Sequence, residues 1–118
     1  MFLEVLSRIA NRIDGAIALS LVAADGIAVE SVSNDPELDI EVLSAELIAQ
    51  ARSIGDNHRE IAMGEVQQVS VTTDLGTVMV SSLTKDYYLL LVLGTEGSYG
   101  RARFEMRRAR LLLEDELT

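Results

Sequence analysis

The sequence predicts a single α+β domain with three helices and five strands in the order α-β-β-α-β-β-β-α. Its 118 residues are the size of one domain, so residues 1–118 are expected to form one unit. Three segments place apolar residues at helical spacing, and five have the apolar or alternating pattern of strands. The turns within the first pair of strands, and within the following three, are so tight that neighbouring strands must be antiparallel.

The chain is expected to open with a short amphipathic helix followed by an apolar strand. Residues 2–13 place apolar side chains at helical spacing. Asp14 and Gly15 end that helix, because both residue types are typical of turns. Residues 16–23 are then apolar almost throughout, which favours a strand.

A β-hairpin is expected next. Asp25-Gly26 lies between the strand at 16–23 and a second, partly apolar run at 27–32. Asp-Gly favours a type I′ turn, in which both central residues have positive φ. The strand at 27–32 should therefore lie antiparallel to the strand before it.

A long helix is expected over roughly residues 40–60. Asp39 is suited to cap its N-terminus, because a carboxylate there accepts a hydrogen bond from the first turn. Gly55 either ends this helix early or weakens it by about 1 kcal/mol relative to alanine. The residues of the face expected to pack on the sheet are Ile40, Leu43, Leu47, Ala51 and Ile54.

The opposite face of the same helix carries small or apolar residues where charged ones are usual. These residues are Val42, Ala45, Ala49 and Ser53. One interpretation is helix propensity alone, because alanine is the best helix former. The other is a helix–helix contact with a second copy or a partner, because small side chains let another backbone approach closely.

Three strands and a last helix complete the predicted fold. The strands are expected at 65–73, 77–83 and 87–93, joined by two tight turns. Residues 87–93 read YYLLLVL, and a run this apolar is typical of a central strand that is covered on both faces. The last helix is expected over residues 99–116, and the residues of its core face are expected to be Tyr99, Ala102, Met106, Ala109, Leu113 and Leu117.

The strand at 65–73 is the most polar of the five, which suits the edge of a sheet. It contains neither proline nor lysine, and Glu65 is its only charged residue. Such an unprotected edge can pair with a second chain. We therefore expect a two-fold dimer in which the middle helix also takes part. The residues expected at this interface are Glu65, Gln67, Gln68, Val69, Ser70, Val71, Val42 and Ala49.

The last helix carries half of the ten basic side chains of the chain, namely Arg101, Arg103, Arg107, Arg108 and Arg110. One interpretation is a solvated helix face, and another is a docking patch for an acidic protein surface. Phe104 and Leu111 lie on the side of this helix that is remote from its core face. An apolar pair on one exposed ridge indicates a contact.

Composition excludes several classes of function. The chain has no cysteine, which excludes disulfides, cysteine-ligated zinc and thiol nucleophiles. The formal net charge of −9 at pH 7 disfavours nucleic acid and anionic lipid as partners. The single histidine, His58, lies near the end of the middle helix and is interpreted as structural. No catalytic, cofactor-binding or metal-binding residue is therefore assigned.

The membrane is not expected to hold this chain. Its longest apolar run is far shorter than the ~20 residues of a spanning helix. The N-terminus lacks the basic region of a secretory signal, so a cytoplasmic protein is expected.

Taken together, the segments resemble the Roadblock (dynein light chain) family over nearly the whole chain. The resemblance lies in an opening helix that ends in Asp-Gly, in the hairpin AIALSLVAADGIAV at 16–29, in YYLLLVL at 87–93, and in GRARFEMRRA at 100–109. Within this family, the chain looks most like the prokaryotic MglB-like regulators of Ras-like GTPases.

The resemblance implies a five-stranded antiparallel sheet with the middle helix on one face and the two terminal helices on the other. Two copies would join through the third strand and the middle helix into a ten-stranded sheet. A Ras-like GTPase would dock on the paired middle helices. The residues expected to contact it are Val42, Ala45, Ala49, Arg52 and Ser53.

In this class the regulator positions catalytic groups that belong to the GTPase, so no arginine of this chain is assigned a catalytic role. The chain is thus expected to be a non-enzymatic homodimer that modulates GTP hydrolysis or polarity signalling. Three alternatives stay open. The chain could be a structural adaptor, in a homo- or heterodimer without effect on hydrolysis, a sensor of a small ligand, or an enzyme that uses His58.

Overall fold

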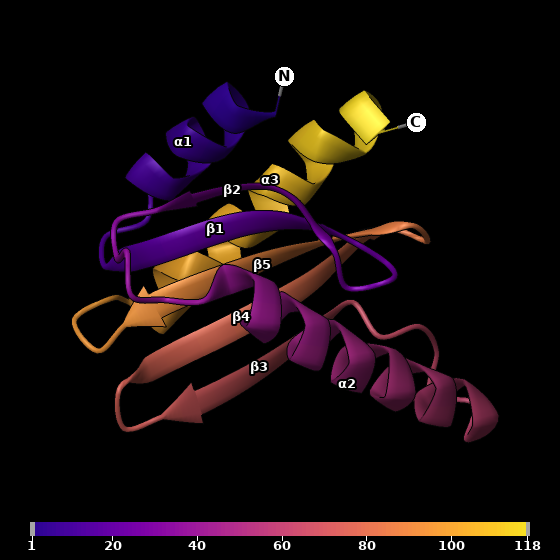
Figure 1. Cartoon of the computed structure of the whole chain (residues 1–118). Coiled ribbons are helices and arrows are strands. Elements are labelled where there is room, and N and C mark those ends of the chain that lie inside the picture. The colour runs from indigo at the N-terminus through magenta and orange to yellow at the C-terminus, as the bar shows by residue number, and fades with distance from the viewer. Residues whose placement is uncertain (1, 118) are drawn as a thin grey trace.

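Five antiparallel strands form one sheet in the order β2-β1-β5-β4-β3 (Figure 1). The computed structural model describes residues 2–117, and of Arg59 and Glu60 it describes the backbone only. The elements are α1 (Leu3–Asn11), β1 (Ala16–Ala23), β2 (Ala28–Ser33), α2 (Ile40–Glu60), β3 (Gln68–Thr73), β4 (Gly76–Thr84), β5 (Tyr87–Gly94) and α3 (Tyr99–Leu117). The predicted element order is confirmed.

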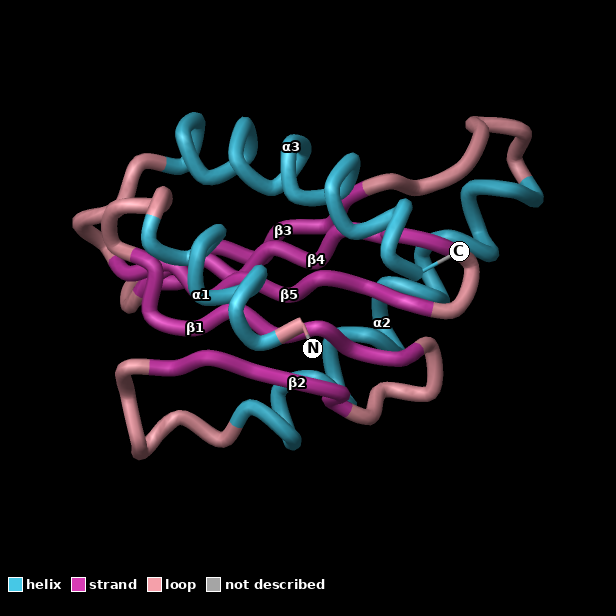
Figure 2. The backbone as a smooth tube through the Cα atoms, turned by 90° about the horizontal axis from the view of Figure 1, so that it is seen from above, coloured by secondary structure: helices cyan, strands magenta, loops and turns pink. Residues whose placement is uncertain are grey.

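The helices cover both faces of the sheet. Figure 1 shows α2 in front of the strands and α3 behind them, and in the turned view α3 runs along one margin of the molecule (Figure 2). β5 lies at the centre, and its side chains alternate between the two layers. Leu89 and Leu91 pack in the core shared with α1 and α3, whereas Leu90 and Val92 pack in the core shared with α2. The sequence-based prediction of a central strand that is covered on both faces is therefore confirmed.

The first hairpin forms, but its turn is not the predicted type I′. Gly26 has a φ of +89°, while neither Ala24 nor Asp25 has a positive φ. The Gly26 N–H donates to the carbonyl of Ala23 at 2.8 Å, and the Ala23 N–H donates to the carbonyl of Ile27 at 2.9 Å. The connection is thus a three-residue loop in which glycine takes the left-handed position.

The middle helix begins where predicted. The backbone N–H of Val42 donates to Oδ1 of Asp39 at 3.1 Å, which is the expected N-terminal cap. The helix continues through Gly55 to Glu60, so Gly55 does not end it.

The face of α2 that packs on the sheet includes the predicted Ala51, and the predicted Ile40, Leu43 and Leu47 pack against the same core. Its centre lies beside the predicted residues. The buried residues are Ser44, Ile48, Ala51 and Gly55, whereas Ile40, Leu43, Leu47 and Ile54 are only partly buried. Three of the four buried residues are small. Hydrophobic periodicity gives little weight to serine and glycine, so it placed the centre of this face on the neighbouring leucines.

β3 is shorter than predicted. The strand begins at Gln68, so Glu65 and Gln67 lie in the segment that leads from α2 into it. Ala62 and Gly64 have positive φ values of 59° and 88°, which turn the chain sharply before the strand. The prediction that Glu65 is part of the edge strand is therefore wrong.

Two glycines offer a matched test of the backbone. A Cβ atom at Gly76, whose φ is +154°, would clash with the carbonyl oxygen of Leu93, whereas a Cβ atom at Gly55 would meet nothing within 4 Å. We expect Gly76→Ala to lower the free energy of unfolding by more than about 1 kcal/mol. Gly55→Ala should raise it by about 0.5–1 kcal/mol, because Gly55 is inside a helix. Urea unfolding followed by circular dichroism measures both, and equal effects would contradict this account of the two positions.

Candidate functional site

The outer side of β3 presents backbone groups that no strand of the described chain covers. β3 is the last strand of the sheet formed by residues 2–117. The Ser82 N–H donates to the Gln67 carbonyl at 3.0 Å. Because antiparallel hydrogen bonds alternate along a strand, the N–H and C=O groups of Gln68, Ser70 and Thr72 point away from β4. A further strand could pair with these groups.

This edge is also uncharged. Residues 68–73 read QVSVTT, so no like charges would meet if two copies paired along it. Val69 packs against the core under α2, and Val71 is 41% exposed on the same face of the strand. The structure thus keeps Gln68, Val69, Ser70 and Val71 of the predicted interface in one edge strand.

The outer face of α2 carries the predicted small or apolar residues together with one charged residue. Val42, Ala45, Ala49 and Ser53 are all exposed, and exposed Glu46 lies one turn after Val42 among them. Ala45 differs from the others, because its Cα lies 3.1 Å from the position that a Cβ atom at Gly26 would occupy. The first hairpin therefore already touches Ala45, and Ala49 is the better probe of a contact with another molecule.

Arg52, which was predicted to contact a partner, also makes a hydrogen bond within the chain. Its Nη1 donates to the carbonyl of Ala24 at 2.9 Å. This hydrogen bond ties α2 to the loop of the first hairpin. The arginine therefore helps to hold the hairpin against the helix.

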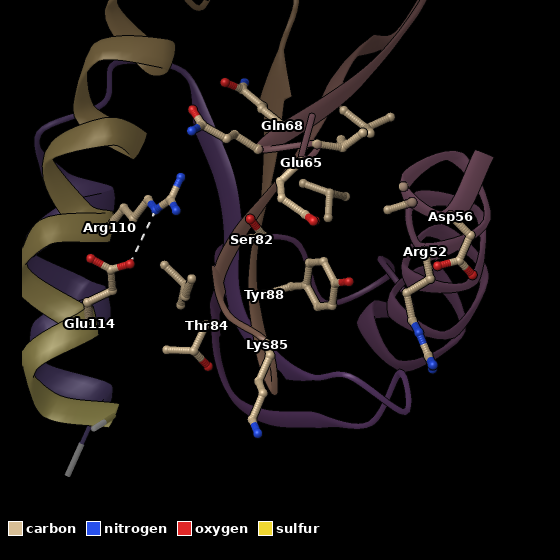
Figure 3. A pocket seen from close by; sticks show the side chains of 17 residues that line it. Arg52, Asp56, Glu65, Gln68, Ser82, Thr84, Lys85, Tyr88, Arg110 and Glu114 are labelled. Atoms are coloured by element: carbon tan, nitrogen blue, oxygen red, sulfur yellow. Dashed lines mark ion pairs between the residues drawn. The ribbon is translucent and has the colours of Figure 1, made fainter. Parts of the chain in front are cut away.

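A cavity of about 600 Å³ lies where α2, the segment before β3 and the end of β4 meet. It exists because β4 continues to Thr84 while its neighbour β3 begins only opposite Ser81. Figure 3 shows Tyr88 in the middle of this space, with Arg52 and Asp56 of α2 on one side. On the other side, Arg110 and Glu114 of α3 form an ion pair at 3.5 Å.

The chemistry of the cavity is mixed. Its lining includes the cations Arg52 and Lys85 and the anions Asp56 and Glu65, so it favours neither sign of charge in a ligand. Gln67 lines it as well, and thus Glu65 and Gln67 border a cavity rather than the pairing edge.

Among residues 2–117, no group of three His, Asp or Glu side chains could hold a metal ion. His58 uses its Nδ1 for a hydrogen bond with the carbonyl of Ile54, at 2.9 Å, within its own helix. That bond fits the structural interpretation of this histidine.

The helices of the described chain are too short or too polar to cross a membrane. The cytoplasmic location expected from the sequence stays a prediction.

Two polar contacts of α3 were missed in the sequence. Tyr99 was expected in the core but is 44% exposed, and its hydroxyl donates to Oγ of Ser70 at 3.2 Å. Glu105 is buried, although it lies between arginines on a helix surface. The remaining core residues of this helix are as predicted, because Ala102, Met106, Ala109 and Leu113 are all buried.

No family model and no curated protein matches the sequence, but solved structures do. A Roadblock/LC7 domain from Streptomyces avermitilis is 20% identical, with a TM-score of 0.86, and 98% of this chain and 97% of that chain are covered. MglC from Myxococcus xanthus is 28% identical, with a TM-score of 0.72 and 98% of both chains covered. An MglB structure with a tetrameric arrangement is 16% identical, with a TM-score of 0.86, and 95% of this chain and 84% of that chain are covered.

These likenesses confirm the resemblance to the Roadblock family that was predicted from the sequence. The chain has the Roadblock fold, with a five-stranded antiparallel sheet and three helices in the order α-β-β-α-β-β-β-α.

Ser70→Pro tests whether the open edge of β3 pairs with a second copy. Proline removes an N–H that points away from β4, so the hydrogen bonds within the sheet are kept while pairing beyond it is blocked. We expect the mass of the assembly, measured by analytical ultracentrifugation, to fall with little change in circular dichroism. Val71→Pro is the control, because its N–H points toward β4 and its loss should destabilise the sheet itself. An unchanged mass for Ser70→Pro would exclude pairing along this edge.

Proposed function

We propose that this chain is a non-enzymatic regulatory module that forms a homodimer through β3 and α2 and binds a Ras-like GTPase, whose GTP hydrolysis it modulates. The observation that carries the proposal is the uncharged, open edge of β3 next to a helix with a small-residue outer face. The likeness to MglB and MglC structures supports the same function.

The geometry of the edge supports the proposed dimer. The outward groups of Gln68, Ser70 and Thr72 are symmetric about Ser70, so an antiparallel pair of β3 strands would place Gln68 of each copy opposite Thr72 of the other. The pair would make one sheet of ten strands. Both α2 helices would then lie on the same face of that sheet, with their outer faces close together.

The paired α2 helices form the proposed docking surface for the GTPase. Ala49 and Ser53 present little side chain, so a partner backbone could approach closely. The exposed acidic residues Glu41, Glu46 and Asp56 belong to the same helix, so the matching surface of the GTPase should be basic. In this arrangement the chain orients the GTPase and contributes no catalytic group of its own.

The test is GTP hydrolysis by the Ras-like GTPase encoded closest to this gene, with and without a molar excess of this chain. We expect a change in the hydrolysis rate and a complex of the two proteins. Ala49→Arg should weaken that complex at least ~10-fold, which corresponds to about 1.4 kcal/mol. It inserts a long, charged side chain where the surfaces meet.

Gln50→Arg is the matched control, because it adds the same side chain to a neighbouring exposed position outside the small-residue face. It should leave the complex intact. A complex without any change in hydrolysis would favour the adaptor function. No complex, or equal effects of the two arginines, would refute the docking surface.

A further inference from the structure

The outer face of α3 carries large apolar side chains that the chain itself leaves uncovered. Phe104, Leu111 and Leu112 are 53%, 68% and 51% exposed. They belong to α3, which runs along one margin of the molecule (Figure 2) and packs in the core opposite to that of α2. An exposed apolar ridge of this kind, bordered by charged residues, is typical of a contact surface.

The charged residues beside this ridge are held in place by a buried carboxylate. The side chain of Glu105 is only 2% exposed, and its Oε1 lies 3.5 Å from Nη2 of Arg101 and 3.3 Å from Nη1 of Arg108. The same two guanidinium groups lie 5.9 and 5.8 Å from the centre of the Phe104 ring. Phe104 thus stands between two arginines that are already ordered, which lowers the entropy lost when a partner binds.

The residues of the ridge are arranged symmetrically about Arg108. Phe104 and Leu112 lie four residues before and four residues after Arg108. Arg101 and Asp115 lie seven residues before and seven residues after it. Consider two α3 helices packed antiparallel about a two-fold axis near Arg108. Phe104 of each helix then faces Leu112 of the other, with Leu111 beside it, and Arg101 faces Asp115.

We propose that the outer face of α3 is a self-association surface at which two copies of this chain pack their α3 helices antiparallel. Apolar side chains meet apolar ones, and each Arg101 meets an Asp115. The two Arg108 side chains come together near the axis. Each Arg108 is paired with its own Glu105. Arg101 shares that carboxylate, and Asp115 of the other copy supplies the second negative charge, so the repulsion at the axis is lowered.

The distribution of charge favours a second copy of this chain as the partner of the outer face of α3. Residues 1–100 hold 15 of the 19 acidic side chains and only half of the basic ones, so most surfaces of two copies repel each other. Residues 101–118 hold five basic and four acidic side chains, which makes α3 nearly neutral and locally alternating. This surface is separate from β3 and α2, so the inference does not depend on the proposed function.

A charge swap tests the pairing of Arg101 with Asp115. Analytical ultracentrifugation in low salt would follow the Ser70→Pro chain, in which pairing through β3 is blocked and α3 alone can join two copies. We expect this chain to form a dimer. Arg101→Asp and Asp115→Arg should each weaken it at least ~10-fold. The double variant Arg101→Asp with Asp115→Arg should restore most of the affinity, because the opposite charges face each other again.

One control changes the same charge on another side of α3. Arg103 is exposed but lies off the ridge, so Arg103→Asp should leave the dimer unchanged. Leu112→Glu is an independent probe, since Leu112 is half exposed and its loss leaves the core intact. It should abolish the association.

A Ser70→Pro chain that is monomeric at about 1 mM would overturn the proposal. So would a double variant no better than either single one. If β3 pairing is absent, Ser70→Pro and the unmodified chain will have the same mass, yet the swap still reports on α3. Failure of the proposed dimer and failure of the α3 contact are therefore distinguishable.

Discussion

The burial of β5 on both faces is the constraint on which the rest of the structure depends. Its run from Leu89 to Leu93 is almost wholly excluded from water, and no single layer of helices could cover both sides. The apolar surface of these side chains, at about 25 cal/mol per Å², therefore requires a helix layer on each face. α2 takes one face, and α1 and α3 take the other. The two outer surfaces of the molecule are thereby made by different helices, with different side chains available for contacts.

Most of the fold could be predicted because local patterns and tertiary contacts agree. The tight turns, the apolar run of β5 and the cap at Asp39 each have a local cause that the structure keeps. Prediction failed where two local patterns look alike. Glu65 and Gln67 alternate with apolar residues as a strand does, and only the left-handed residues Ala62 and Gly64 show that the chain turns there.

Two features of the candidate site could also be predicted from local patterns. An uncharged edge and a small-residue helix face are visible in sequence, because they depend on residue type and spacing. Residue type and spacing do not show whether another molecule covers this edge and this helix face. The bond from Arg52 to Ala24 joins residues 28 positions apart, and no local pattern indicates it. Glu105, in contrast, lies four residues after Arg101 and three before Arg108, a spacing that does suggest an ion pair.

The division of the surface between α2 and α3 also gives the molecule an electric dipole across its sheet. Exposed Glu41, Glu46 and Asp56 outnumber exposed Arg52 on the α2 side, whereas the charges of residues 101–118 on the α3 side nearly cancel. A charged protein that diffuses toward it would therefore turn it before contact, so that a basic surface arrives at α2 more often than chance allows. Because mobile ions screen such a field over about 8 Å at physiological ionic strength, this orientation acts only in the last steps of an encounter.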